Sequence, residues 1–538
     1  MPLPLLRDET LILPRAMIRS CRQAQFRLKV SDSSGQVLSG GSLLMRILVL
    51  RRLLMREVFA VGEKQIGILL PPSVGAVIVN SAVTLARRVT ANLNYTATSE
   101  IVNACIARAE IQHVLTSRRV MEKLNLDLDA EVLYLEDFRD KVTWLDKAVA
   151  AIEAYLFPVA LLDWLLGLNR IDPDDVLTVI FTSGSTGDPK GVMLTYLNVA
   201  SNVDAIAQTV RPQREDTILG ILPFFHSFGY TVTFWGPMAL GFAATYHFTP
   251  LDARAIGKLA KKYRATILLA TPTFLRSYVK RCPAEDFVDL NVVVVGAEKL
   301  STAVSDGFNQ KFGVRPTEGY GATELSPLVS VNVPPSRSQC VAGEIDFKEG
   351  TVGRPVEHVK VKVVNQETGV DLPTGQPGML LVSGTNVMKG YMGQPEKSAK
   401  VLRDGWYVTG DIATIDEDGF ITITGRESRF SKIGGEMIPH VRVEETIQQC
   451  VADEDTEEVL VVVTAVPDER KGEKLVVVHK PLSKSAETIC GELVAAGLPL
   501  VWVPAVHNFI QVEEIPLLGS GKIDLKAVTE LAKQRFGA

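Results

Sequence analysis

Ten residues in the first half of the chain have the types and the order that a polyphosphate needs. They follow an apolar, β-branched run at 176–181, which predicts a buried strand. Glycines let the backbone turn its N–H groups inward, and hydroxyls and one lysine add donors and a positive charge. The segment is not the GxxxxGKS/T loop, because Asp188-Pro189 stands where that pattern has a glycine. Its residues are Thr182, Ser183, Gly184, Ser185, Thr186, Gly187, Asp188, Pro189, Lys190 and Gly191.

Further along, glycine stands with aromatic, acidic or basic residues in several short segments. In chain order they are 223–229 (PFFHSFG), 320–324 (YGATE), 407–411 (YVTGD), 425–426 (GR) and 516–522 (PLLGSGK). With the loop at 182–191, this order resembles that of the adenylate-forming enzymes, the family of acyl-CoA synthetases, luciferases and peptide-synthetase adenylation domains. The resemblance implies that a carboxylate attacks the α-phosphate of ATP to give an acyl-adenylate, after which a thiol takes the acyl group.

The resemblance implies catalytic roles for four side chains. Glu324 is a hard oxygen ligand suited to Mg²⁺, and the Thr323 hydroxyl is expected beside the α-phosphate. His226 is expected to orient the carboxylate of the acid, and Lys522 to bring a positive charge to the α-phosphate on a flexible stem. A histidine among phenylalanines is often only a core group, and a lysine at a loop tip often only keeps a surface soluble. The order of the motifs favours the functional interpretation of both.

A second group of residues is implied to bind the nucleotide. Asp411 can accept hydrogen bonds from both ribose hydroxyls, with Arg426 as a further ribose contact, and Tyr320 offers an aromatic face to the adenine. An aspartate after a glycine is otherwise a turn residue that caps the next strand. The full set expected to bind ATP or AMP is Thr182, Ser183, Gly184, Ser185, Thr186, Gly187, Lys190, Gly296, Ala297, Glu298, Tyr320, Gly321, Thr323, Asp411, Arg426 and Lys432.

The residues after Arg426 resemble the family's mobile C-terminal lid. Lys522 must approach the α-phosphate for adenylation and then leave, so that the acceptor thiol can enter. The family places the pivot two residues after the arginine, usually at an aspartate or lysine, whereas this chain has Ser428 there. Gly434 and Gly435 are implied to line the channel for a pantetheine arm.

The elements that must position these residues alternate between strands and helices. Up to about residue 330, apolar strands such as 266–270 and 292–295 alternate with helices such as 252–263, which is typical of α/β layers with parallel strands. Shorter alternating strands predict a small β subdomain at about 350–425. With these elements, the resemblance to the adenylate-forming enzymes implies a large α/β N-terminal adenylation domain at 1–427 and a small mobile α+β lid domain at 428–538.

Composition excludes several other classes of protein. The chain has 538 residues, too many for one core, and 46% apolar and 22% charged residues, as in ordinary globular proteins. A net charge of −5 gives no electrostatic footprint for nucleic acid. The six cysteines form no CxxC pair and no metal-spaced cluster, and no signal peptide is evident, so a reduced cytosolic compartment is expected.

Several segments look like one branch of the family, the ligase half of the bifunctional 2-acylglycerophosphoethanolamine acyltransferase/acyl-ACP synthetase. They are 226–232, 296–300, 432–437 and 516–522. The resemblance implies ATP- and Mg²⁺-dependent activation of a medium- or long-chain fatty acid and its transfer to the 4′-phosphopantetheine thiol of acyl carrier protein, feeding phospholipid acylation. With coenzyme A as the acceptor, the chain would be a fatty acyl-CoA ligase. A non-catalytic acyl- or nucleotide-binding descendant is disfavoured by the retained charges of Lys190, Glu324, Asp411, Arg426 and Lys522.

One segment raises the question of a membrane. Residues 148–168 come nearest to an apolar span, but Glu153, Pro158 and Asp163 interrupt them. The part at 154–166 could lie in a membrane interface with Tyr155 and Trp164 at headgroup depth, or it could be a core or dimer-facing helix. The expected location is cytoplasmic, with peripheral contact at the inner face of the membrane left open.

Overall fold

The chain divides into two compact units. This computed structural model describes residues 12–59, 62–182, 189–340, 345–433, 436–451, 459–468, 471–516 and 523–536. The larger unit comprises Met1–Lys362, Leu381–Thr409 and Ile415–Thr422, and the smaller one Val363–Leu380, Gly410–Thr414 and Ile423–Ala538. The boundary expected between residues 427 and 428 stays a prediction.

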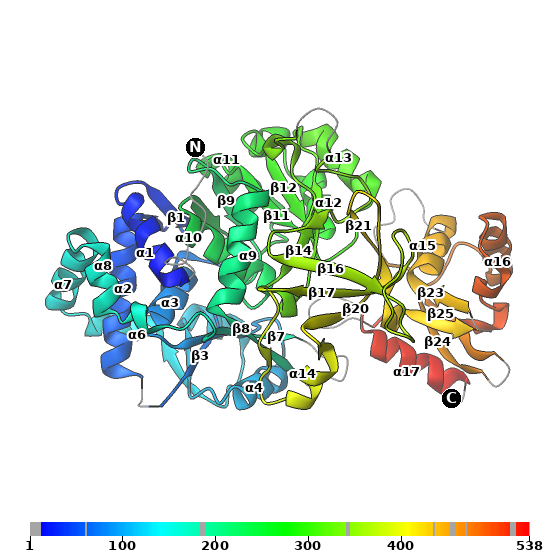
Figure 1. Ribbon diagram of the computed structural model, residues 1–538, viewed down its shortest axis with the longest axis horizontal. Helices are drawn as coiled ribbons and strands as arrows, with labels where there is room; N and C mark the ends of the chain where they lie inside the picture. The colour runs from blue at the N-terminus through cyan, green and yellow to red at the C-terminus, as the bar shows by residue number, and fades with distance from the viewer. Residues whose placement is uncertain are drawn as a thin grey trace. The chain divides into compact units, whose positions relative to one another are not determined.

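A nine-stranded sheet in the larger unit carries the candidate adenine and magnesium segments, and its strands β9, β11, β12 and β14 are labelled in Figure 1. Its central strands, from β13 to β1, pair in parallel, whereas the edge strands β14, β15 and β2 are antiparallel. The central strand Val292–Val295 is buried along its whole length, as expected where helices cover both faces of a parallel sheet. In spatial order the strands are β15 (Arg354–Pro355), β14 (Leu328–Val331), β13 (Thr317–Gly321), β12 (Val292–Val295), β11 (Ile267–Ala270), β9 (Thr217–Gly220), β10 (Ala243–Tyr246), β1 (Leu28–Asp32) and β2 (Val37–Ser39).

A seven-stranded sheet in the same unit holds the two ends of the predicted phosphate loop. Five of its strands are parallel, and β8 and β18 add antiparallel pairs at one edge. The order is β18 (Gly390–Tyr391), β8 (Lys190–Thr195), β7 (Val176–Thr182), β4 (Val89–Asn92), β3 (Gln65–Ile68), β5 (His113–Thr116) and β6 (Glu131–Tyr134). The two sheets and their helices confirm the predicted α/β class.

Several helices of the larger unit begin where a short polar side chain caps their free N–H groups. Thr195 and Asn198 form a reciprocal capping box at the start of α9, as Thr143 and Asp146 do at the start of α7. The helices are α1 (Leu13–Gln23), α2 (Gly40–Glu57), α3 (Val74–Leu85), α4 (Ser99–Arg108), α5 (Arg118–Leu124), α6 (Leu135–Lys141), α7 (Trp144–Tyr155), α8 (Val159–Leu165), α9 (Tyr196–Thr209), α10 (Gly236–Leu240), α11 (Ala253–Tyr263), α12 (Pro272–Arg281), α13 (Thr302–Phe312) and α14 (Pro395–Val401). No helix among the described residues is long and apolar enough to span a bilayer.

A third sheet follows, in the part of the chain where short strands were expected. Its order is β16 (Val359–Val364), β17 (Gly378–Gly384), β20 (Trp406–Ile415) and β19 (Leu402–Arg403), and β21 (Ile421–Arg426) pairs with β20. Asp411 lies in the middle of β20 and Arg426 is the last residue of β21, and both are candidate nucleotide ligands.

The C-terminal part of the smaller unit is a three-stranded sheet with helices on both faces. Alternate residues of the strands point to opposite faces, so Val461 and Val463 pack with α15 and α16, whereas Val462 and Val466 pack with α17. Its elements are β22 (Phe430–Ile433), β23 (Glu436–Pro439), α15 (His440–Val451), β24 (Val461–Asp468), β25 (Gly472–His479), α16 (Ala486–Ala495), β26 (Phe509–Gln511) and α17 (Leu525–Phe536). These elements form the small α+β body that the sequence predicts.

Candidate active site

The phosphate loop is held at both of its ends by a β-hairpin. Strand β7 ends at Thr182 and β8 begins at Lys190, and these two residues lie opposite each other in the antiparallel register. Lys190 is half-buried. The hairpin therefore places the lysine directly across from the first residue of the loop. The predicted loop residues Ser183, Gly184, Ser185, Thr186 and Gly187 lie outside the described residues, as do Gly434, Gly435 and Lys522.

Glu324 lies beside a tyrosine that the sequence did not single out. The carboxylate belongs to a short 3-10 turn, η5 (Thr323–Leu325), which follows β13. The Tyr391 hydroxyl donates a hydrogen bond to Glu324 Oε1 at 2.8 Å, and the Tyr391 ring centroid lies 5.1 Å from Lys190 Nζ. Glu324 and Tyr391 are 67 positions apart, so no local spacing could have indicated the pair.

The predicted acid segment lies next to Thr323. Ser227 Oγ donates to Thr323 Oγ1 at 3.4 Å, which brings segment 223–229 and segment 320–324 together. The His226 side chain is exposed, and its ring centroid lies 4.5 Å from that of the buried Phe225. The histidine is thus on the surface of this segment and not in its core.

The segment turns sharply after His226 into a π-helix, η3 (Phe228–Trp235). A Cβ atom on Gly229 would lie 2.1 Å from the Pro223 carbonyl oxygen, closer than real Cβ contacts come. Only glycine fits this approach without movement of the backbone.

The expected adenine residues follow the carboxyl ends of adjacent parallel strands. Gly296 follows β12, and Tyr320 lies near the end of β13. A Cβ atom on Gly296 would lie 3.4 Å from the Phe228 ring and 3.6 Å from the Gly319 carbonyl oxygen. Ala297 has a left-handed φ of +69°, and Glu298 Oε2 accepts a hydrogen bond from Thr273 Oγ1 at 2.8 Å. Ligands of open α/β sheets bind at this edge.

The predicted ribose residues meet in the smaller unit. Asp411 Oδ1 accepts a hydrogen bond from Arg426 Nε at 2.7 Å. The Asp411 side chain is 3% exposed and that of Arg426 is 65% exposed, so the carboxylate lies beneath the guanidinium. Gly410 precedes it at a φ of +75°, a conformation that glycine adopts readily. The structure thus brings the two expected ribose contacts together.

Burial and the carboxylate keep two tyrosines protonated. Burial first, and then the charge of Glu324, raise the pKa of Tyr391 and of Tyr407 above the ordinary tyrosine range. A hydrogen bond also joins the two hydroxyls. At neutral pH both hydroxyls therefore keep their protons, so Tyr391 can donate to Glu324 and Tyr407 can donate to Tyr391.

The predicted hinge leads into a short antiparallel ribbon. Ser428 lies in the 3-10 turn η7 (Glu427–Arg429), and Lys432 lies on β22 opposite Met437. After the turn, Arg429 forms a buried ion pair with Glu444, and Ser431 Oγ lies 2.7 Å from His440 Nε2. Burial, followed by the charge of Arg429, lowers the pKa of His440 to about 3, so this histidine is neutral at physiological pH.

Glu324 fits a magnesium ion that is shared with a substrate. Within the described residues, no three His, Cys, Asp or Glu side chains gather as a complete metal site. Mg²⁺ commonly binds through one or two carboxylates and takes its remaining ligands from phosphates and water. A single half-buried carboxylate beside the Thr323 hydroxyl is consistent with that mode of binding.

Known proteins resemble the chain in sequence and in fold. The model of the family described as AMP-binding enzyme matches residues 20–392. A long-chain-fatty-acid–CoA ligase of Bacillus subtilis is 32% identical over 369 residues, which are 67% of this chain and 62% of that protein. A 4-coumarate–CoA ligase of Solanum tuberosum is 30% identical over 375 residues, 66% of each. The match thus spans slightly less than two thirds of the length of these relatives.

Solved structures extend the likeness over nearly the whole chain. ATP-bound MatB from Rhodopseudomonas palustris superposes with a TM-score of 0.78 at 24% identity and covers 97% of this chain and 99% of that one. The o-succinylbenzoate CoA synthetase MenE from Bacillus subtilis, in complex with an acyl-adenylate, gives 0.77 at 20% identity, with 95% and 96% covered. These likenesses confirm the predicted fold, a large N-terminal domain followed by a smaller C-terminal one.

Proposed function

Since the chain belongs to the AMP-binding enzyme family, we propose that it is an AMP-forming ligase that joins a fatty acid to a thiol. The observation that carries the proposal is the convergence of Lys190, Thr323 and Glu324 in the larger unit. Tyr391 contacts both the lysine and the glutamate, and Ser227 of the acid segment contacts the threonine. A phosphate-binding cation, a magnesium carboxylate and an acid pocket are the parts that adenylation requires.

The first half-reaction builds negative charge on phosphate oxygens. Lys190 and the backbone of residues 183–187 are proposed to bind the β- and γ-phosphates, and Glu324 to hold Mg²⁺, which neutralises charge on the phosphates when it is bound. His226 is proposed to orient the acid. Lys522 is proposed to stabilise the α-phosphate and then to withdraw about Ser428, so that the thiol reaches the acyl-adenylate.

The acid is proposed to be a medium- or long-chain fatty acid, and the acceptor a pantetheine thiol. The names of the Bacillus and Escherichia coli relatives, long-chain-fatty-acid–CoA ligases, support the acid and favour coenzyme A. Acyl carrier protein, the acceptor expected from the sequence, presents the same thiol on a protein. Competition between coenzyme A and the carrier protein in one assay separates the two. A product that is mostly acyl-CoA supports coenzyme A as the acceptor.

ATP–pyrophosphate exchange over fatty acids of rising chain length tests the reaction. The wild type should catalyse exchange of pyrophosphate with ATP. Lys522→Ala should lower the exchange rate about 10²–10³-fold, as when one preorganised charge is removed from a transition state. It should still form thioester from a supplied acyl-adenylate. Lys526→Ala, an exposed lysine near the start of α17, is the matched control and should keep the wild-type rate. A wild type that shows no exchange with any fatty acid would exclude the proposed activity.

The same function includes peripheral contact with lipid, for which two helices offer a surface. We call it the α7–α8 face. Seven of the twenty exposed large apolar side chains of the described residues lie on it, each between 40% and 78% exposed. A long-chain acid partitions into lipid, so an enzyme that collects it gains from resting on a bilayer. The face consists of Trp144, Leu145, Ile152, Leu156, Leu161, Trp164 and Leu165.

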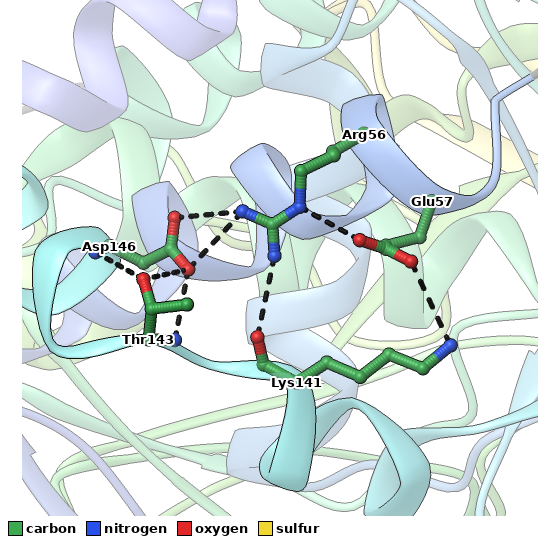
Figure 2. A network of polar contacts seen from close by, with 5 residues as sticks. All are labelled: Arg56, Glu57, Lys141, Thr143 and Asp146. Carbon is green, nitrogen blue, oxygen red and sulfur yellow. Dashed lines mark hydrogen bonds and ion pairs between the residues drawn. The ribbon is translucent and has the colours of Figure 1, made fainter.

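Acidic residues of these two helices point away from that face. Figure 2 shows Asp146 at the start of α7, bound by the Arg56 guanidinium and by Thr143, with Glu57 and Lys141 beside them. The other two carboxylates of these helices, Glu153 and Asp163, are also paired with arginines, which come from α2 and α1. These pairs are Arg52 with Glu153, and Arg15 and Arg19 with Asp163. Lys147, by contrast, is exposed, which suits an anionic surface.

Only part of the predicted interfacial segment 154–166 faces outward. Leu161, Trp164 and Leu165 are exposed, but Leu162 and Asp163 are buried. Tyr155, expected at headgroup depth, packs on α2, where a Cβ atom on Gly41 would lie 2.6 Å from its ring. The surface instead extends back along α7 to Trp144. Pro158 interrupts the segment, and α8 begins after it.

Sedimentation with anionic and neutral vesicles tests the contact with lipid. The triple variant Leu156→Ser, Leu161→Ser, Leu165→Ser should lose binding to anionic vesicles. The control Leu251→Ser, Val288→Ser changes exposed apolar residues elsewhere in the larger unit and should keep it. Equal vesicle binding by the wild type and the triple variant would exclude the α7–α8 face. A concentration-dependent dimer that the triple variant abolishes, without any vesicle binding, would instead identify a second copy of the chain as its partner.

A further inference from the structure

Tyr391 joins two segments that carry the charges of the proposed reaction. It lies on the two-residue strand β18, which pairs with β8, the strand that begins at Lys190. The Met392 N–H donates to the Gly191 carbonyl oxygen at 2.7 Å on one side of this strand. On the other side, the Met388 N–H donates to the Glu324 carbonyl oxygen at 2.8 Å. The backbone around Tyr391 is therefore fixed to both segments.

The side chain continues the same connection. Its hydroxyl donates to Glu324 Oε1 at 2.8 Å, and Lys190 Nζ lies 5.1 Å from the centroid of its ring. Tyr391 is 4% exposed, so these contacts are made largely out of water, where a hydrogen bond to a charged group is strong. One aromatic side chain thus touches both the cation and the carboxylate.

A second buried tyrosine holds the first in place. Tyr407 lies on β20, is 5% exposed, and shares a hydrogen bond with the Tyr391 hydroxyl. The Tyr391 backbone N–H also donates to Ser398 Oγ of α14 at 2.8 Å. With its backbone and hydroxyl both fixed, Tyr391 can fix the plane of the Glu324 carboxylate and hence the direction of Oε2.

We propose that Tyr391 is a positioning residue. Its hydroxyl orients the Glu324 carboxylate toward the magnesium ion, and its ring fixes the position of the Lys190 ammonium group. This inference rests on the proposed function, because it takes Glu324 as the magnesium ligand and Lys190 as the phosphate contact. A purely structural tyrosine would fill the same space, and its loss would change stability without changing how the protein responds to magnesium.

Two substitutions at Tyr391 separate its hydroxyl from its ring. Tyr391→Phe removes the donor to Glu324 but keeps the ring beside Lys190, and Tyr391→Leu removes both. Tyr278→Phe is the matched control, because Tyr278 is also buried and its hydroxyl donates to the Pro250 carbonyl oxygen at 2.7 Å, away from Glu324. Tyr391→Phe and Tyr278→Phe each remove one buried tyrosine hydroxyl, and Tyr391→Phe also removes the hydrogen bond shared with Tyr407.

ATP binding measured by calorimetry at a series of Mg²⁺ concentrations is the readout. Tyr391→Phe should raise the Mg²⁺ concentration for half-maximal ATP binding about tenfold, the low end of the loss for a hydrogen bond to a charged group. Tyr391→Leu should raise it further and should also weaken ATP binding at saturating Mg²⁺. Tyr278→Phe should leave the Mg²⁺ dependence unchanged even where it lowers the thermal midpoint.

The outcomes distinguish this inference from the proposed function. If Glu324→Gln abolishes the Mg²⁺ dependence but Tyr391→Phe behaves like Tyr278→Phe, the positioning role is wrong and the proposed function stands. If the wild type binds no ATP at any Mg²⁺ concentration, both are wrong. A tenfold shift in Tyr391→Phe with an unchanged thermal midpoint supports the positioning role.

Discussion

Asp216→Ala should be among the most destabilising single changes in the larger unit. Asp216 and Arg337 form a buried ion pair, with Arg337 Nη2 at 2.8 and 2.9 Å from the two carboxylate oxygens and both side chains 5% exposed. The carboxylate also accepts hydrogen bonds from Thr266 Oγ1 at 2.7 Å and from the Gln213 N–H at 2.6 Å. Removal of the carboxylate would leave a buried guanidinium without its counter-charge.

Such a loss costs about 3–5 kcal/mol of unfolding free energy, whereas breaking an exposed pair costs at most about 1 kcal/mol. Asp289→Ala supplies the matched comparison, because Asp289 also binds an arginine, Arg264, whose side chain is 79% exposed. Urea unfolding followed by tryptophan fluorescence measures the free energy of unfolding of both variants. The two are compared where the slope of that free energy against urea concentration is the same. The double variant Asp216→Leu, Arg337→Met removes both charges and should recover part of the loss.

The location of the Asp216–Arg337 ion pair in the sheet leads to a second prediction for Asp216→Ala, which concerns ATP affinity. Asp216 precedes β9 and Thr266 precedes β11, so the ion pair lies at the amino edge of the parallel sheet, opposite the edge where the candidate adenine residues lie. At a temperature where the variant stays folded, its affinity for ATP should match that of the wild type. A loss of stability no greater than that of Asp289→Ala would refute the reasoning.

Three further predictions concern a buried lysine, a glycine and the ribose carboxylate. Burial lowers the pKa of Lys29 to about 8, below its ordinary 10.5, so the unfolded chain binds more protons between these pH values. The urea midpoint of the wild type relative to Lys29→Met should therefore rise across that window, and a constant difference would contradict this. Gly229→Ala should cost about 1–3 kcal/mol through overpacking, whereas Gly236→Ala, whose Cβ would have no neighbour nearer than 3.8 Å, should cost less; equal thermal midpoints would count against the close contact. Asp411→Asn should weaken ATP binding much more than fatty-acid binding in calorimetric titrations, and unchanged ATP affinity would leave Asp411 as a turn residue.

Local patterns in the sequence were enough to predict the class of the fold and many of its elements. The β-branched run 292–295 forms β12, and the stretch 252–263 forms α11 with Asp252 as its N-terminal cap. Both could be predicted because a run of apolar β-branched residues and a capping side chain are visible in consecutive residues. The order of the motifs also indicated the family, because the functional side chains of each motif are close together in the sequence.

Contacts between distant segments were decided only by the tertiary structure. Glu324 and Tyr391 are 67 positions apart and Asp216 and Arg337 are 121 apart, and no periodicity joins such pairs. The same holds for exposure, since Leu161 faces outward and its neighbour Leu162 is buried. Sequence states which side chains are apolar or charged. Which of them meet, and which remain in water, depends on how the helices and sheets pack, and only the folded chain sets that.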